Sequence, residues 1–232
     1  MAIKLTERRP WVLLPGTLCS GRVFDGFLGC MGVPEGNRHT VAMRHPCVDD
    51  YEPELTAACV YGAVVCGFSL GAIVAAQLAD RLPAAAYLLF GLNPFPDPPE
   101  KRGGRLDLAG DVGRLGGAGA LASRLPKLAG PDPDRARRLI LDMADETAEN
   151  IAAQTELALG RPGALDALSR TTLPVRLLTG TQDTTAPVAL AEAAAQSAPL
   201  GRLVPLQQLG HYALVENPLA CCRAVENSFV PA

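Results

Sequence analysis

Residues 63–71, Ala-Val-Val-Cys-Gly-Phe-Ser-Leu-Gly, constrain the fold more than any other part of this chain. An apolar, β-type run from Ala63 to Cys66 leads directly into a G-x-S-x-G motif, and a helix-compatible segment follows from Ala72 to about Leu82. Strand, tight turn and helix in this order are the context in which the motif exposes a reactive serine at a strand end. The sequence therefore predicts Ser69 as a nucleophile, and a merely flexible turn is the alternative.

The glycines of the motif have a steric reason in such a turn. Gly67 and Gly71 lack the Cβ atoms that would collide where the chain reverses so tightly. The turn also leaves the Leu70 N–H free near a helix N-terminus, where N–H groups suit a developing negative oxygen. We expect Leu70 to contribute one donor of an oxyanion hole.

Short apolar runs alternate with segments of helical spacing over most of the chain. Such alternation is typical of an α/β fold with a mostly parallel sheet and helices on both faces. The predicted strands are 11–14, 39–43, 63–66, 85–90, 175–179 and 202–206. The predicted helices are 23–31, 54–61, 72–82, 187–197 and 217–229.

The segment from Phe95 to Leu173 breaks this alternation. It begins with several prolines, is rich in glycine over 103–119, and regains helical spacing at 132–147 and 149–159. Ordinary crossovers are much shorter. We therefore expect a core of residues 1–94 and 174–232, with 95–173 inserted as a helical cap. This lid would cover the strand ends and hinge through its glycine-rich part, whereas an ordinary crossover with disordered loops is the alternative.

Composition excludes several classes of protein. A chain of 232 residues suffices for one ample core, and the net charge of −3 with no long run of one sign favours neither a nucleic-acid nor a membrane partner. Apolar runs stay well below the roughly 18 residues of a membrane helix, and Trp11–Leu14 is too short for a signal peptide. Seven cysteines without C-x-x-C spacing indicate neither a disulfide framework nor a zinc site, so we expect a cytoplasmic protein.

A serine hydroxyl needs a base to remove its proton. Of three histidines, His39 falls in a predicted strand and His45 in a loop, and we expect only structural roles for both. His211 follows Gly210 just after the predicted strand 202–206, so it lies at a strand end as Ser69 does. We therefore predict His211 as the base.

An orienting carboxylate should come from another strand end. Asp183 follows the run Val175–Gly180 and precedes a helix that Pro187 could start, although an aspartate there could simply cap the helix or shape the turn. Asp97, after the preceding strand, is the weaker alternative. The chain order Ser, Asp, His favours Asp183, because one particular fold uses that order.

A second oxyanion donor is expected from the turn after the first strand. There Pro15-Gly16 is followed by Thr17 and Leu18, and we favour the Thr17 N–H, with Leu18 as the alternative. The aromatic residues Phe68, Phe95 and Tyr212 flank the predicted catalytic positions. They are candidates for an apolar substrate wall, or else for ordinary core packing.

In these motifs the chain resembles the α/β-hydrolase superfamily, over roughly residues 11–94 and 173–230. The resemblance rests on Leu13-Leu14-Pro15-Gly16-Thr17, Gly67–Gly71, Gly180-Thr181-Gln182-Asp183 and Gly210-His211-Tyr212, in the family's order. It is similar to small single-domain members with a helical cap after the sixth strand. The chain departs from the family where Pro15 replaces the usual histidine, and where Trp11 begins what resembles the third strand, so the first hairpin is missing or reduced.

The resemblance implies an ester or thioester hydrolase for a small or medium acyl substrate, free or tethered to a carrier, that works through an acyl-enzyme. A biosynthetic lyase, cyclase or acyltransferase with the same Ser69, Asp183 and His211 is one alternative, and a non-catalytic ligand-binding homologue is another. No G-x-G-x-x-G after a strand, no P-loop and no metal-ligand cluster occurs, so we expect neither cofactor nor metal.

Overall fold

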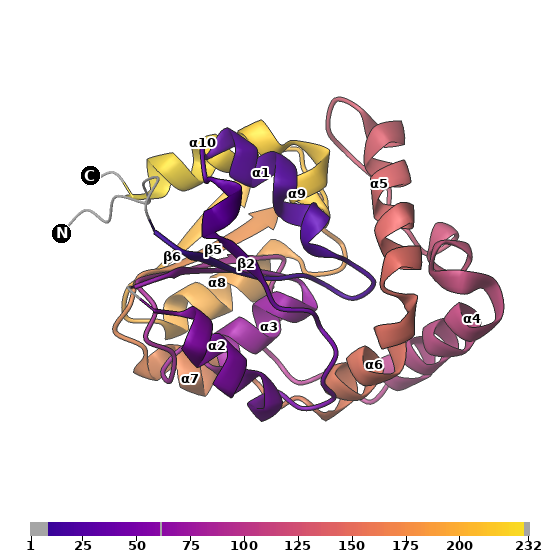
Figure 1. Cartoon of the computed structure of the whole chain (residues 1–232), viewed down its shortest axis with the longest axis horizontal. Coiled ribbons are helices and arrows are strands. Elements are labelled where there is room, and N and C mark those ends of the chain that lie inside the picture. Colours follow the sequence, from indigo (N-terminus) through magenta and orange to yellow (C-terminus); the bar gives the residue numbers. More distant parts are fainter. Residues whose placement is uncertain (1–8, 61, 230–232) are drawn as a thin grey trace.

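A single six-stranded sheet organises the chain, in a computed structural model that describes residues 9–60 and 62–229 (Figure 1). Every strand pair is parallel, and the strand order is β2-β1-β3-β4-β5-β6. The strands are β1 (Trp11–Leu14), β2 (Arg38–Thr40), β3 (Val64–Phe68), β4 (Ala86–Phe90), β5 (Val175–Gly180) and β6 (Gly201–Leu206).

Helices follow the strands in chain order. The α-helices are α1 (Asp25–Cys30), α2 (Glu52–Ala58), α3 (Leu70–Gln77), α4 (Lys101–Ala122), α5 (Pro133–Glu146), α6 (Ile151–Gly160), α7 (Leu165–Arg170), α8 (Val188–Ser197), α9 (Ala213–Glu216) and α10 (Pro218–Phe229). Four short 3₁₀ helices complete the described ranges: η1 (Gly21–Phe24), η2 (Glu35–Asn37), η3 (Asp49–Tyr51) and η4 (Ala148–Asn150).

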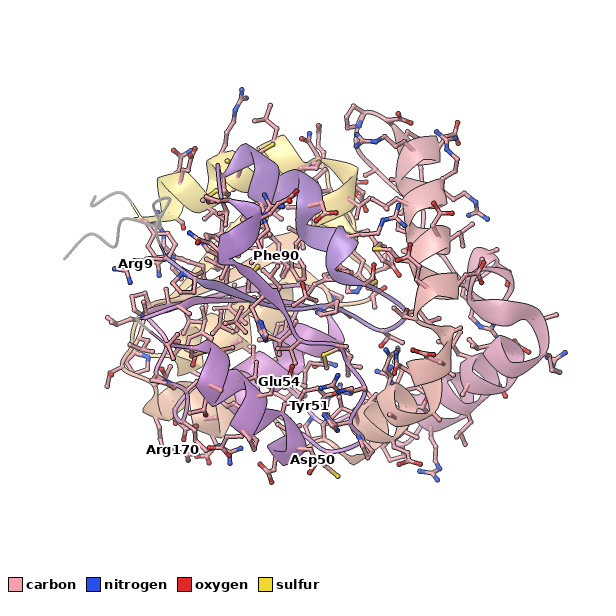
Figure 2. All side chains as sticks on the ribbon, viewed as in Figure 1. Arg9, Asp50, Tyr51, Glu54, Phe90 and Arg170 are labelled. Atoms are coloured by element: carbon pink, nitrogen blue, oxygen red, sulfur yellow. The ribbon has the colours of Figure 1, made fainter. Side chains whose placement is uncertain are left out.

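Helices cover both faces of the sheet, because side chains alternate along each strand. Trp11 and Leu13 of β1 enter a core shared with α1 and α10, whereas Val12 and Leu14 enter one shared with α2, α3, α7 and α8. Figure 2 shows the two sides through Phe90, which lies toward α1, and Tyr51, which lies toward α2. The predicted α/β fold, with a mostly parallel sheet and helices on both faces, is confirmed.

The predicted strands differ from the observed ones chiefly at β2. The sequence predicts a strand over 39–43, but it ends at Thr40; Val41 still donates to the Leu13 carbonyl before the chain turns. The predicted helix 54–61 is found as α2, which begins at Glu52 and already ends at Ala58. Residue 61 lies outside the described residues, as does any hairpin strand within 1–8.

Three helices from the 95–173 segment stand beside the α/β body. Figure 1 shows α4, α5 and α6 together at one side, where α4 packs against both α5 and α6. Helix α5 also contacts η1 and α9, which follow the carboxyl ends of β1 and β6. The fourth helix, α7, packs instead against α3 and α8.

The glycine-rich part of this segment is helical, which its composition did not predict. It forms α4, interrupted only at Gly116, where φ is 74° and ψ is 171°. Its apolar side chains Val112 and Leu121 are buried, and α4 packs against α5 and α6. Tertiary packing thus overrides the low helix propensity of glycine.

The length of the helices and the state of the cysteines concern the described residues as a whole. No helix within them has both the length and the apolar character that crossing a membrane requires. All seven cysteines are free thiols, and five of them are buried.

Candidate active site

Ser69 lies on a strained turn between β3 and α3. Its φ of 50° and ψ of −113° place a non-glycine residue in a sparsely populated region of backbone space, which costs about 1–3 kcal/mol. The turn is tied to the neighbouring strand, because the Ser69 N–H donates to the Phe90 carbonyl at 2.9 Å. The side chain remains partly exposed at the end of the strand.

Close packing explains both glycines of the motif. A Cβ on Gly71 would collide with the Leu14 carbonyl oxygen, and one on Gly67 would lie 2.6 Å from the Ala72 Cα. Both obstacles are backbone atoms, which cannot move without displacing β1 or α3. The glycines therefore let α3 start directly against the sheet.

His211 brings the predicted residues together. Its Nε2 lies 3.1 Å from the Ser69 Oγ, and its Nδ1 lies 2.8 Å from the Asp183 Oδ2. A carboxylate only accepts, so Nδ1 carries the proton and Nε2 is free to accept one from the serine hydroxyl. His39 and His45 lie elsewhere, near Glu54 and Tyr51 respectively.

Asp183 is fixed by its own loop. Its Oδ1 accepts from the Thr185 and Ala186 N–H groups, each at 2.8 Å, which leaves Oδ2 for the imidazole. The loop is also joined to the histidine loop, since the Gln182 N–H donates to the Leu209 carbonyl at 2.9 Å. Asp183 is 6% exposed and His211 7%, so their contact is shielded from water.

Asp97, the alternative carboxylate, makes different contacts. It pairs with Arg105 and, at 2.7 Å, with the buried Arg161, whose side chain also donates to the Phe95 carbonyl. Burial alone would raise the pKa of Asp97, but the two guanidinium groups hold it below its usual value. Asp97 therefore links the start of the 95–173 segment to Arg161, directly after α6.

Near Ser69, the backbone N–H groups of Thr17 and Leu70 are among those without an acceptor in the described part of the chain. Leu70 begins α3, so its N–H belongs to the unpaired first turn of that helix. The Leu18 N–H, by contrast, donates to the Gln154 side chain at 3.0 Å. Of the two predicted second donors, only Thr17 keeps its N–H available.

The last residue of the same turn, Cys19, carries a thiol that is inert. Burial raises the pKa of Cys19 to about 12, although the Gly16 backbone opposes the shift, so the group stays a neutral thiol. Within residues 9–60 and 62–229, no group of three His, Cys, Asp or Glu side chains could hold a metal ion.

The aromatic candidates lie in two places. Phe68 and Tyr212 pack against His211, with ring centroids 5.2 and 5.6 Å from the imidazole, and both are almost fully buried. Phe95 is 39% exposed at the start of the 95–173 segment, and the ring contacts around His211 in the described residues do not include it.

Three residues near this site carried no recognised signal in the sequence. A Cβ on Gly91, whose φ is 60°, would lie 2.9 Å from the His211 Cε1; a glycine directly after a buried strand could have indicated such a close approach. Glu216 is buried and accepts from the Gly210 N–H at 2.7 Å. Gln154 reaches the Leu18 turn from α6.

Comparison with known proteins agrees with this architecture. A pimeloyl-[acyl-carrier protein] methyl ester esterase from Aromatoleum aromaticum is 29% identical over 208 aligned residues, which cover 79% of this chain and 80% of the relative. A Thermogutta terrifontis esterase superposes with a TM-score of 0.80 at 21% identity, over 95% of this chain and 89% of that one. An enol-lactonase from Burkholderia xenovorans LB400 superposes with a TM-score of 0.76 at 17% identity, over 97% of this chain and 93% of that one.

The family model of the α/β hydrolases matches residues 11–224, which span the whole sheet, the Ser69 turn and the loops of Asp183 and His211. The chain therefore belongs to the α/β hydrolase family.

Proposed function

We propose that this protein is a serine-dependent hydrolase that cleaves a small or medium acyl ester or thioester through an acyl-enzyme. The observation that carries the proposal is the hydrogen-bonded chain from the Ser69 Oγ through His211 to Asp183. Its serine is partly exposed on a strained turn and its other two members are buried, which suits a nucleophile with a preorganised base.

In the first half of the reaction, the Ser69 Oγ attacks the substrate carbonyl carbon as its proton passes to the His211 Nε2. The carbonyl electron pair becomes an oxyanion, which the Thr17 and Leu70 N–H groups stabilise. Asp183 stabilises the imidazolium. As the tetrahedral species collapses, the bond to the alcohol or thiol breaks and His211 returns its proton to that leaving group.

In the second half, His211 takes a proton from a water molecule that attacks the acyl-enzyme carbonyl. The second tetrahedral species uses the same two N–H donors. Its collapse releases the acid and returns the proton to the Ser69 Oγ. Each step uses only side chains and backbone groups of this chain, so the reaction needs no reactant besides the ester and one water molecule.

The names of the relatives suggest which ester substrates belong in the proposal. One relative is named for the methyl ester of a pimeloyl group on an acyl carrier protein, and two structural neighbours are named as an esterase and an enol-lactonase. All three names describe ester bonds. We therefore extend the proposal to acyl esters carried on a protein-bound thioester arm, alongside free esters.

The α4–α6 helices are the proposed lid of this site. Gln154 on α6 bonds to the Leu18 turn, and Glu146 at the end of α5 bonds to Ser20 at 2.8 Å. Both contacts lie on the loop that follows β1, whose Gly16 packs closely against Ser69. A lid there would exclude water and select the acyl group.

Activity assays with a covalent probe test the function. Purified protein is assayed with p-nitrophenyl esters of increasing acyl length and with acyl-thioesters, while a serine-directed phosphonate labels the nucleophile for identification by peptide mass. We expect turnover and a label on Ser69. A label on another residue would overturn the mechanism, and labelling of Ser69 without hydrolysis of any ester would favour a lyase, cyclase or acyltransferase.

A second assay tests the carrier-linked substrate. The same acyl methyl ester is offered free and attached to an acyl carrier protein, and the released methanol is measured. A higher kcat/KM for the carrier-linked form supports the extension. Equal values would restrict the proposal to free esters.

A further inference from the structure

Gln154 of α6 joins two loops that are distant in sequence. Its side chain is 2% exposed, its Oε1 accepts from the Leu18 N–H at 3.0 Å, and its Nε2 donates to the Met43 carbonyl at 3.2 Å. The reversed amide would face an N–H with its own NH₂ group, so only this orientation satisfies both bonds. A buried side chain held at both ends is a rigid support.

The turn that Gln154 supports is strained. It runs from Gly16 to Cys19 and closes through the Cys19 N–H to the Gly16 carbonyl at 3.2 Å. Leu18 within it has a φ of 54°, a conformation that a bulky residue keeps only when its surroundings impose it. The N–H of this strained residue is the group that Gln154 binds.

The geometry of the turn sets the direction of the Thr17 N–H. No cis peptide occurs in the described residues, and in a trans peptide the carbonyl and the N–H point in opposite directions. Because the Gly16 carbonyl points into the turn, the Thr17 N–H points out of it. The turn lies against the nucleophile, since a Cβ on Gly16 would come within 3.1 Å of the Ser69 Cβ.

The exposed side of the same loop is held less firmly. Glu146 accepts from the Ser20 Oγ and pairs with Arg22, but both charged side chains are about 40% exposed, and exposed ion pairs contribute little. Among the hydrogen bonds and ion pairs that the described residues form between the α4–α6 helices and this loop, the buried bond of Gln154 is therefore the firmest.

We propose that Gln154 is a positioning residue: it holds the Leu18 turn so that the Thr17 N–H meets the oxyanion, and thereby makes oxyanion stabilisation depend on the docking of α6. This inference rests on the proposed serine hydrolase function. It assigns a catalytic consequence to a side chain of the proposed lid that touches neither the substrate nor the reacting atoms.

Gln154→Met tests the inference, with Gln77→Met as the matched control. Methionine keeps the length of the side chain but neither hydrogen bond. Gln77 is also buried, and it donates from α3 to the Pro162 carbonyl, away from the turn.

For Gln154→Met we expect kcat on the best p-nitrophenyl ester to fall about ten- to a hundredfold with KM within about threefold. Gln77→Met should lower the melting temperature comparably and keep kcat within about twofold. Unchanged kcat in Gln154→Met, or equal kcat losses in both variants, would overturn the inference.

Gln154→Glu supplies a rescue with a pH signature. A neutral carboxyl can supply one donor and one acceptor, the two roles that the amide fills here, whereas the ionised form places a second acceptor oxygen against the Met43 carbonyl. The ratio of its kcat to that of the wild type should therefore be highest at acidic pH and fall as pH rises. If Gln154→Met does not fold, this ratio decides the question, and a ratio that is the same at every pH overturns the inference.

Phosphonate labelling of the wild type distinguishes a wrong role for Gln154 from a wrong proposed function. If the wild type labels at Ser69 and hydrolyses esters while Gln154→Met keeps wild-type kcat, only the role of Gln154 is wrong. If the wild type neither labels nor hydrolyses any ester, the proposed function is wrong and the inference falls with it.

Discussion

The His211 Nε2 lies 3.1 Å from the Ser69 Oγ, although 142 positions separate the two residues in the chain. Ser69 follows β3 and His211 follows β6, at opposite sides of β4 and β5 in the sheet order. The contact therefore depends on the whole parallel sheet presenting its carboxyl ends at one edge. A change at Ser69 should alter chemistry with little effect on that framework.

Ser69→Ala is expected to lower kcat by about 10⁶, as loss of a serine nucleophile does elsewhere, with the melting temperature nearly unchanged. Alanine adopts the strained turn no worse than serine, so the fold should persist. Ester hydrolysis and thermal unfolding are the measurements. Ser169→Ala, at an exposed serine on α7, is the control and should behave as wild type. Wild-type turnover by a folded Ser69→Ala protein would exclude the covalent mechanism.

Asp183→Asn should lower kcat by about 10⁴ while the protein stays folded, because an amide favours the wrong tautomer of His211. Asp97→Asn is the matched control. It should keep kcat but destabilise the protein by about 3 kcal/mol, since it leaves the buried Arg161 without a counter-charge. Ester hydrolysis and urea unfolding of both variants check this. The reverse outcome would make Asp97 the orienting carboxylate.

Gly71→Ala should destabilise the protein by about 3 kcal/mol or more, because the added Cβ collides with the Leu14 carbonyl and neither backbone can yield. Gly110 is exposed on helix α4, and no atom lies near a Cβ added there. Gly110→Ala should therefore stabilise the protein by about 0.5–1 kcal/mol. Urea unfolding measures both changes. A loss of stability in Gly110→Ala would contradict the helical state of α4.

Glu216→Gln is expected to gain stability relative to wild type as pH rises. Burial raises the pKa of Glu216 above its usual value, although the Gly210 N–H opposes the shift, so the folded protein holds this proton more firmly than the unfolded chain. Stability of the wild type should therefore fall from the usual glutamate pKa up to the raised one. The neutral glutamine lacks this dependence and still accepts from Gly210.

Urea unfolding of both proteins between about pH 4 and pH 7 tests this sign. The difference in unfolding free energy, variant minus wild type, should grow with pH and then level off. A difference that is constant over the range would show that Glu216 ionises as readily in the folded state as in the unfolded one.

The sequence by itself determined the local elements and the identity of the candidate residues. The apolar runs at β1, β3, β4 and β5 are nearly continuous because those strands are buried on both faces, and such runs are visible without a structure. The G-x-S-x-G motif and the strand-end positions of Asp183 and His211 follow from the same local pattern, because parallel strands present their ends at a common edge.

Only the tertiary structure decided which groups meet. The choice between Thr17 and Leu18 as the available donor depends on Gln154, more than a hundred residues away, and the role of Asp97 depends on Arg161. Helix α4 forms despite its glycines because it packs against α5 and α6, with Val112, Ala120 and Leu121 buried. These features arise from contacts between distant segments, and no local pattern of residues encodes them.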